Sequence, residues 1–143
     1  MKSALIVMVL ADALTGTWIL NRGRTHYGGG ADVRQRETMT CESERHHVRC
    51  TINSKRSDGR TLVGRFAAGY DGKPGVATGI PDVDSVSLRG VDDHLADATF
   101  NFKGKPVFGY RMIKTDDEHS LIIVAVDPMT RKVLNSVVVY DRK

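Results

Sequence analysis

Polar and apolar residues alternate along most of this chain, and turn residues interrupt the alternation about every 8 to 14 positions. A period of two places successive side chains on opposite faces of a strand. No stretch after residue 14 repeats its apolar residues at helical spacing. We therefore expect an all-β protein whose consecutive strands are joined by short turns into an antiparallel meander.

Turn residues show where the strands should end. The pairs Asp58-Gly59, Asp71-Gly72 and Lys103-Gly104 are typical of tight turns, as is the acidic cluster Asp116–Glu118. Nine or ten strands are predicted between such turns, over residues 16–21, 33–42, 47–55, 60–70, 75–78, 84–91, 94–103, 106–114, 120–127 and 133–141.

The two ends of the chain suggest how this sheet is completed. Trp18, the only tryptophan, lies on the first predicted strand, and Val137–Arg142 forms the last one. Pairing between them would remove both sheet edges and close the sheet. The sequence thus predicts a single antiparallel meander β-barrel of about eight to ten strands.

The first thirteen residues have the order of a secretory signal: Lys2, the apolar run Ala4–Leu10, and then Ala11-Asp12-Ala13 as a small-residue cleavage site. The apolar run is shorter than the roughly 20 residues that a transmembrane helix needs, so no transmembrane segment is expected. We interpret residues 1–13 as a signal peptide and residues 14–143 as one barrel domain, exported to the periplasm or secreted. The alternative is that the segment is a strand or helix of the fold itself.

Two cysteines fit an oxidising compartment. If residues 36–44 and 47–55 form a hairpin with Arg45-His46 at its tip, Cys41 faces Cys50 at a non-hydrogen-bonded position, where side chains lie closest. This register predicts a disulfide. The competing interpretation, a metal site with His46 and His47, lacks a second ligand pair at zinc spacing.

The charge pattern does not indicate a nucleic-acid site. The formal net charge is +4, and acidic residues are interleaved with the basic ones. No run of lysine and arginine forms a continuous basic stripe, so no nucleic-acid partner is expected. Six arginines nevertheless crowd the first third of the chain: Arg22, Arg24, Arg34, Arg36, Arg45 and Arg49.

No catalytic or metal-binding motif stands out. The histidines lack the spacing of metal ligands, and we assign no catalytic residue, no metal and no cofactor. A structural calcium ion held by turn aspartates stays open as an alternative, although capping of nearby N–H groups explains these residues equally well. The histidines are His26, His46, His47, His94 and His119, and the aspartates are Asp82, Asp84, Asp92, Asp93, Asp116 and Asp117.

An aromatic set is the best candidate for lining a cavity. Apolar walls with a few hydroxyl groups are typical of small-molecule pockets. A barrel of eight to ten strands can be filled by side chains or can hold one small ligand; the sequence does not decide between them, and a filled or nearly filled interior is the favoured interpretation. The set comprises Tyr70, Phe100, Phe102, Phe108 and Tyr110, with Phe100 and Phe102 on one face of the segment 94–103.

The chain resembles lipocalin-like (calycin) barrels. Gly16-Thr17-Trp18 is similar to their Gly-x-Trp signature, and Arg142 is placed like the arginine that packs across that tryptophan. The resemblance implies that Trp18 and Arg142 close one end of a barrel through cation–π stacking. Secreted lipocalins also have a C-terminal helix and a middle motif, which this sequence lacks. The resemblance therefore implies an architecture and no particular ligand.

The chain also resembles small exported bacterial proteins of unknown function, through Tyr70–Pro74, Thr78–Leu88 and Val137–Asp141. This implies a bacterial envelope protein and supplies no activity. We expect a non-enzymatic exported barrel that binds a small apolar or amphipathic ligand at the mouth opposite Trp18. The alternative is a protein-interaction module, an inhibitor or an envelope-assembly factor with a filled barrel; the oligomeric state is left open.

Overall fold

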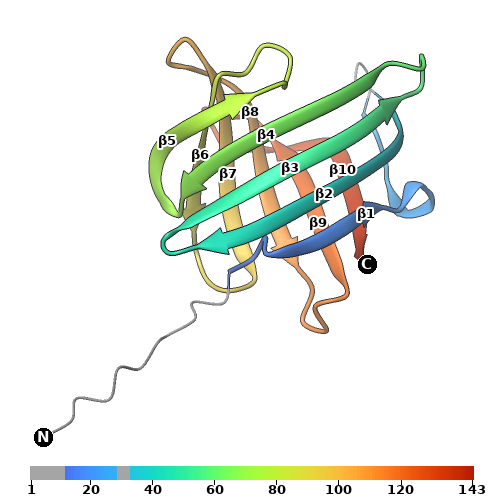
Figure 1. The fold of residues 1–143 in the computed structure, drawn as a ribbon, viewed down its shortest axis with the longest axis horizontal. Helices are drawn as coiled ribbons and strands as arrows, with labels where there is room; N and C mark the ends of the chain where they lie inside the picture. The colour runs from blue at the N-terminus through green and yellow to red at the C-terminus, as the bar shows by residue number, and fades with distance from the viewer. Residues whose placement is uncertain (1–11, 29–32) are drawn as a thin grey trace, which may run out of the picture.

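The computed structural model describes residues 12–28 and 33–143, which form one closed ten-stranded antiparallel barrel (Figure 1). Neighbouring strands are consecutive in the chain, and β1 pairs with β10 to close the sheet. The predicted all-β meander barrel is confirmed. The strands are β1 (Gly16–Leu20), β2 (Arg34–Glu44), β3 (His47–Arg56), β4 (Thr61–Gly69), β5 (Asp71–Thr78), β6 (Ser85–Gly90), β7 (Leu95–Phe102), β8 (Lys105–Lys114), β9 (Ser120–Val126) and β10 (Val133–Arg142), with a short 3₁₀ helix, η1 (Arg22–Arg24), after β1.

Residues 1–11 lie outside the described part of the chain and hold most of the predicted signal peptide. The leader therefore stays a prediction. Among the described residues, no helix has the length and hydropathy that a membrane span requires.

Alternation decides which side chains face the barrel interior. In β7, Ala96, Ala98 and Phe100 are buried while the residues between them are partly exposed. Residues two apart lie on the same face of a strand, so the inward face can be read directly from the sequence. The Lys103-Gly104 pair joins β7 to β8 with φ values of 50° and 77°, as a two-residue hairpin turn of type I′ requires.

One predicted boundary is wrong. β5 begins at Asp71, whereas the sequence placed a turn at Asp71-Gly72 and a strand only from residue 75. Gly72 has a φ of +84°, and the pairing with β6 shifts register between Asp71 and Pro74. The turn residues thus form a bulge within the strand, which absorbs the extra residue without ending the strand.

The β2–β3 hairpin has the predicted register. Arg45 and His46 form its tip, and Cys41 pairs with Cys50 with their Cα atoms 4.1 Å apart. Both cysteines are buried and form a disulfide. The bridge therefore lies inside the barrel wall and joins two strands that are already hydrogen-bonded.

Trp18 closes one end of the barrel. Its side chain is fully buried, and its Nε1 donates a hydrogen bond to the carbonyl oxygen of Leu14 at 2.8 Å. The Arg142 guanidinium lies 4.6 Å from the centroid of the indole ring. Because Trp18 and Arg142 are cross-strand partners, this stacking joins β1 to β10. We call this the Trp18 end.

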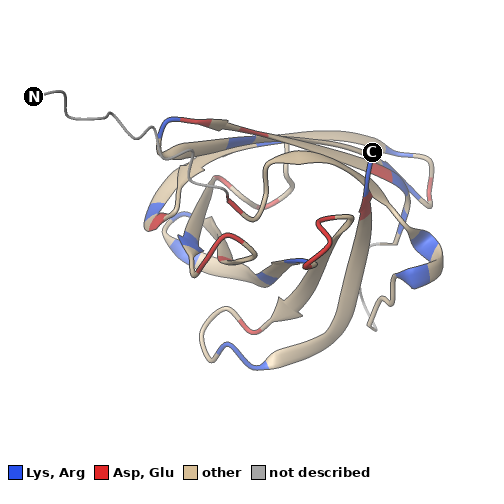
Figure 2. Cartoon of the chain, turned by 90° about the horizontal axis from the view of Figure 1, so that it is seen from below, with Lys and Arg blue, Asp and Glu red and all other residues tan. Residues whose placement is uncertain are grey.

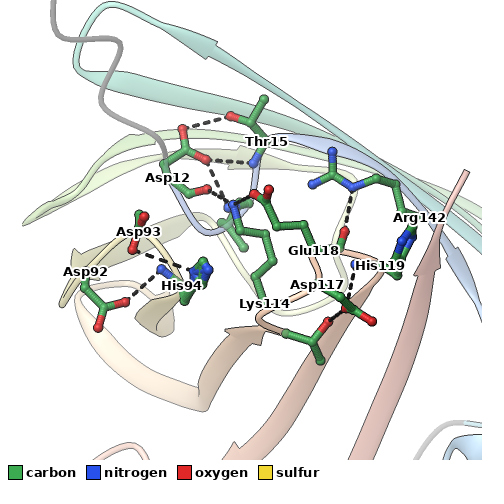
Figure 3. Close-up of polar contacts among 12 residues, drawn as sticks. Asp12, Thr15, Asp92, Asp93, His94, Lys114, Asp117, Glu118, His119 and Arg142 are labelled. Carbon is green, nitrogen blue, oxygen red and sulfur yellow. Dashed lines mark hydrogen bonds and ion pairs between the residues drawn. The ribbon is translucent and has the colours of Figure 1, made fainter.

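A buried lysine crosses the Trp18 end (Figure 3). The Nζ of Lys114 donates to the carbonyl oxygen of Asp12 at 3.0 Å and forms an ion pair with Glu118 at 3.0 Å. The Nε of Arg142 donates to the carbonyl oxygen of Glu118 at 2.8 Å. A buried ammonium group needs such partners. These three contacts join residue 12, the β8–β9 loop and the last strand across the Trp18 end, which forms the closed floor of the barrel.

We predict that Trp18→Ala lowers the free energy of unfolding by about 3 to 5 kcal/mol, because it removes a fully buried aromatic side chain. Ile19→Ala is the matched control: the neighbouring side chain on β1 is 41% exposed, and its loss should cost about 1 kcal/mol or less. Urea unfolding followed by circular dichroism measures both. Equal losses would contradict a special role for Trp18 in closing the barrel.

We predict that reduction of the Cys41–Cys50 disulfide lowers the free energy of unfolding by about 2 to 3 kcal/mol, as expected for a closed loop of about ten residues. Comparing urea unfolding of the oxidised and the dithiothreitol-treated protein measures this. The Cys41→Ala/Cys50→Ala double variant is the control and should not respond to dithiothreitol. An unchanged midpoint in the native protein would show that the bridge contributes nothing.

Candidate functional site

A cavity of about 700 Å³ occupies the half of the barrel away from the Trp18 end. Its lining comes from Arg34 and Arg56, which end their strands at that side, and from the β5–β6 turn Gly79–Asp82. Phe108 and Leu134 also line it and are 42% and 49% exposed, so they mark where the cavity meets solvent. We call this opening the mouth. The interior is hollow, which corrects the favoured expectation of a filled barrel.

One wall of the cavity is apolar. It is formed by Phe66 on β4, Phe100 on β7, Met112 on β8 and Ile123 on β9. The Phe66 and Phe100 rings meet edge to face with centroids 5.9 Å apart, and Tyr110 packs on Phe100 at 5.1 Å. Such contacts hold the rings in fixed orientations and leave an apolar surface toward the cavity.

A glycine on β4 allows the β5–β6 turn to pack closely against the cavity wall. Gly64 on β4 lines the cavity, and a Cβ atom at this position would lie 2.7 Å from Cγ1 of Ile80. Without a side chain at residue 64, Ile80 of the β5–β6 turn can lie directly against the strand. The turn thereby covers one side of the mouth with an apolar residue.

The facing wall carries a buried polar cluster. Nη1 of Arg34 donates to Oε2 of Glu37 at 3.1 Å and to the hydroxyl oxygen of Tyr140 at 2.9 Å. The hydroxyl group of Tyr140 donates in turn to Glu37. The three side chains come from β2 and β10, and Ser54, Arg56 and Tyr27 line the cavity beside them. We call these six residues the polar cluster.

Burial changes the acid–base behaviour of two tyrosines at this cavity. Desolvation raises the pKa of Tyr140 well above its usual range, and it also raises the pKa of Tyr110. Both hydroxyl groups therefore stay protonated and uncharged at neutral pH. The Arg34 guanidinium opposes these shifts, but burial is the larger effect.

Three residues of the predicted aromatic set lie on the cavity: Phe100, Phe108 and Tyr110. The other two do not. Tyr70 lies at the β4–β5 turn beside Gly90, toward the Trp18 end, because β4, which leads into this turn, runs away from the mouth. Phe102 is the last residue of β7, at the rim, where it is 37% exposed and stacks beneath the Lys103 ammonium group at 5.2 Å.

Sequence reasoning missed the polar cluster, although part of its signal was present. Glu37 stands two residues before the buried Met39, and Ser54 and Arg56 continue the inward face of β3. Strict alternation along β2, counted back from Glu37 and Met39, would place the Arg34 side chain on the outer face of the barrel. It turns inward because the β2–β3 pairing shifts register between Arg34 and Arg36.

In the acidic loops at the Trp18 end, aspartate side chains accept hydrogen bonds from backbone N–H groups of the same turns (Figures 2 and 3). Asp92 Oδ1 accepts a hydrogen bond from the His94 backbone N–H at 2.7 Å, and Asp117 Oδ1 accepts one from His119 at 3.0 Å. At the other end of the barrel, Asp84 accepts one from the Lys103 N–H at 3.0 Å. Within the described ranges, no group of three or more His, Cys, Asp or Glu side chains could hold a metal ion.

The comparisons with known proteins add no relative. No protein-family model matches this sequence, and no curated protein or solved structure is significantly similar to it. The likeness to lipocalin-like barrels therefore rests on the ten-stranded antiparallel barrel itself. The likeness to small exported bacterial proteins stays a hypothesis.

We predict that stability falls above pH 10 and that Tyr140→Phe makes the fall less steep. Burial raises the pKa of Tyr140, so the unfolded chain releases this proton near pH 10 while the folded protein retains it. Each such tyrosine costs about 1.4 kcal/mol per pH unit above that point. Urea unfolding at intervals between pH 9 and pH 11.5 measures the slopes. Parallel curves for the two proteins would contradict the prediction.

Proposed function

We propose that this protein binds a small apolar or amphipathic molecule inside the barrel and has no enzymatic activity. The observation that carries the proposal is the cavity of about 700 Å³. Small-molecule sites usually measure about 300 to 1,000 Å³ and combine apolar walls with a few placed polar groups. The apolar wall and the polar cluster supply both.

The cavity also favours ligand binding over the two alternatives, a protein-interaction module and an enzyme. A protein-interaction module with a filled barrel would bury side chains where this chain leaves space. An enzyme would need a histidine or a pair of aspartates converging in a pocket. Among residues 12–28 and 33–143, no histidine and only one aspartate, Asp82, line the cavity. Binding without chemistry is the function that this lining supports best.

We place the function outside the cytoplasm, in the periplasm or the secreted fraction. The support for this is the Cys41–Cys50 disulfide, which is buried in the barrel wall. Disulfides persist in oxidising compartments and are rare in the cytosol.

We predict that Ala125→Trp weakens binding of the neutral apolar probe N-phenyl-1-naphthylamine. Ala125 lines the cavity, so an indole there would occupy the proposed binding volume. The affinity should fall by about tenfold or more, equivalent to about 1.4 kcal/mol. Fluorescence titration measures it, because the emission of the probe rises in apolar surroundings.

Val124→Trp is the matched control. Val124 is the preceding residue on β9 and points to the opposite face of the sheet, away from the cavity. It should bind the probe like the native protein. Equal loss in both variants, or no probe binding by the native protein, would refute the internal site.

A further inference from the structure

An exposed apolar edge crosses one side of the mouth, on the β7–β8 turn and the β9–β10 loop. The two segments are neighbours, because Val126 of β9 pairs with Gly109 of β8 on one side and with Val133 of β10 on the other. Exposed apolar side chains that gather in one place mark an interaction surface, whereas scattered ones need no explanation. The apolar residues of this edge are Phe102, Phe108, Met129, Val133 and Leu134, which are between 37% and 74% exposed.

Three exposed lysines accompany the apolar edge. Lys103 and Lys105 flank the turn between β7 and β8, and Lys132 directly precedes Val133. Asp84 approaches this turn but accepts from the backbone N–H of Lys103, at 3.0 Å. Among the described residues, no carboxylate forms an ion pair with any of the three ammonium groups. We call the apolar edge and these three lysines the lip.

The charge of the barrel changes sign from the lip to the Trp18 end. Residues 102–108 and 127–134 carry four basic residues, of which Arg131 is paired with Asp97. The one acidic residue there, Asp127, accepts from the backbone N–H groups of Met129 and Thr130. At the opposite ends of the same strands, the β6–β7 and β8–β9 loops carry five acidic residues and no lysine or arginine (Figure 2). This asymmetry turns the lip toward a negatively charged surface.

We infer that the lip docks on the surface of an anionic lipid bilayer. A bilayer takes apolar side chains into the boundary between its headgroups and its acyl chains, while neighbouring lysines keep their ammonium groups at the anionic headgroups. The lip presents both kinds of side chain together. Its lysines also favour a bilayer over a protein partner, because lysine is depleted in protein–protein interfaces.

This docking goes beyond the proposed function, because it concerns the outer edge of the mouth and needs no ligand in the cavity. Phe108 and Leu134 belong to the lip and also line the cavity. The substitutions that test the docking therefore use lip residues that do not line the cavity.

Co-sedimentation with lipid vesicles at neutral pH tests the inference on the native protein. Phosphatidylcholine vesicles that contain about 30 mol % phosphatidylglycerol should bind it about tenfold or more tightly than vesicles of phosphatidylcholine alone. Raising NaCl from about 0.05 M to about 0.5 M should weaken this binding about tenfold. Equal binding to both kinds of vesicle would overturn the inference. Binding to neither would also overturn it, and would leave a protein as the partner of the lip.

Matched removal of charge locates the binding surface. Lys105→Gln combined with Lys132→Gln should weaken binding to the anionic vesicles about tenfold or more. Lys73→Gln combined with Lys143→Gln removes the same charge from exposed lysines near the Trp18 end, and should change the binding by about twofold or less. Equal losses in the two double variants would show that net charge alone drives the binding, and would overturn the assignment to the lip.

A matched pair of exposed valines tests the apolar part. Val133 is 70% exposed on the lip, and Val91 is 56% exposed in the β6–β7 loop. Val133→Ser should weaken vesicle binding about threefold or more, whereas Val91→Ser should leave it unchanged. The apolar run Ala4–Leu10 is common to all these variants, so it cannot produce a difference between them. Equal effects of the two serine substitutions would contradict insertion of the lip.

Ala125→Trp separates docking from the uptake of a lipid into the cavity. This substitution occupies the cavity and leaves the lip unchanged, so the variant should bind anionic vesicles like the native protein. Vesicle binding together with a failure to bind N-phenyl-1-naphthylamine would support the docking and count only against the proposed function. Loss of vesicle binding in this variant would show that lipid enters the barrel, and would overturn docking by the lip.

Discussion

The pairing of β1 with β10 is the contact on which the rest of this structure depends. An open sheet of the same strands would have two unpaired edges and no enclosed interior. The pairing itself covers only a few residues, from Trp18 to Leu20, so it needs support from side chains. The buried indole of Trp18 and the stacked guanidinium of Arg142 supply that support, and Lys114 fastens the floor beneath them. The enclosed cavity depends on this pairing of β1 with β10.

Most of the fold could be predicted from the sequence because its determinants are local. Alternation and turn residues fix nearly every strand, and the hairpin register that pairs Cys41 with Cys50 follows from a two-residue tip. The start of β5 was predicted wrongly because Gly72 is compatible with a turn and with a bulge. Only the neighbouring strand β6, which pairs with β5 on both sides of the irregularity, distinguishes the two.

The site was harder to predict because it depends on distances across the barrel. Whether the interior is hollow is set by the barrel radius against the summed volume of side chains from many strands, and inward positions such as Gly64 and Ala125 contribute little volume. Charged residues in strands usually face solvent, so the sequence did not indicate that Glu37 is buried inside the barrel. Arg34 reaches the interior through a register shift that leaves no mark in the sequence. Phe100, Phe108 and Tyr110 line the cavity because the alternation of β7 and β8 extends to the rim.

The closed floor at Trp18 has a kinetic consequence. A molecule held in this cavity would have to enter and leave through the same mouth, so one occupant must depart before the next can bind. Exchange between two such molecules would then follow the dissociation rate of the first occupant, however abundant the competitor.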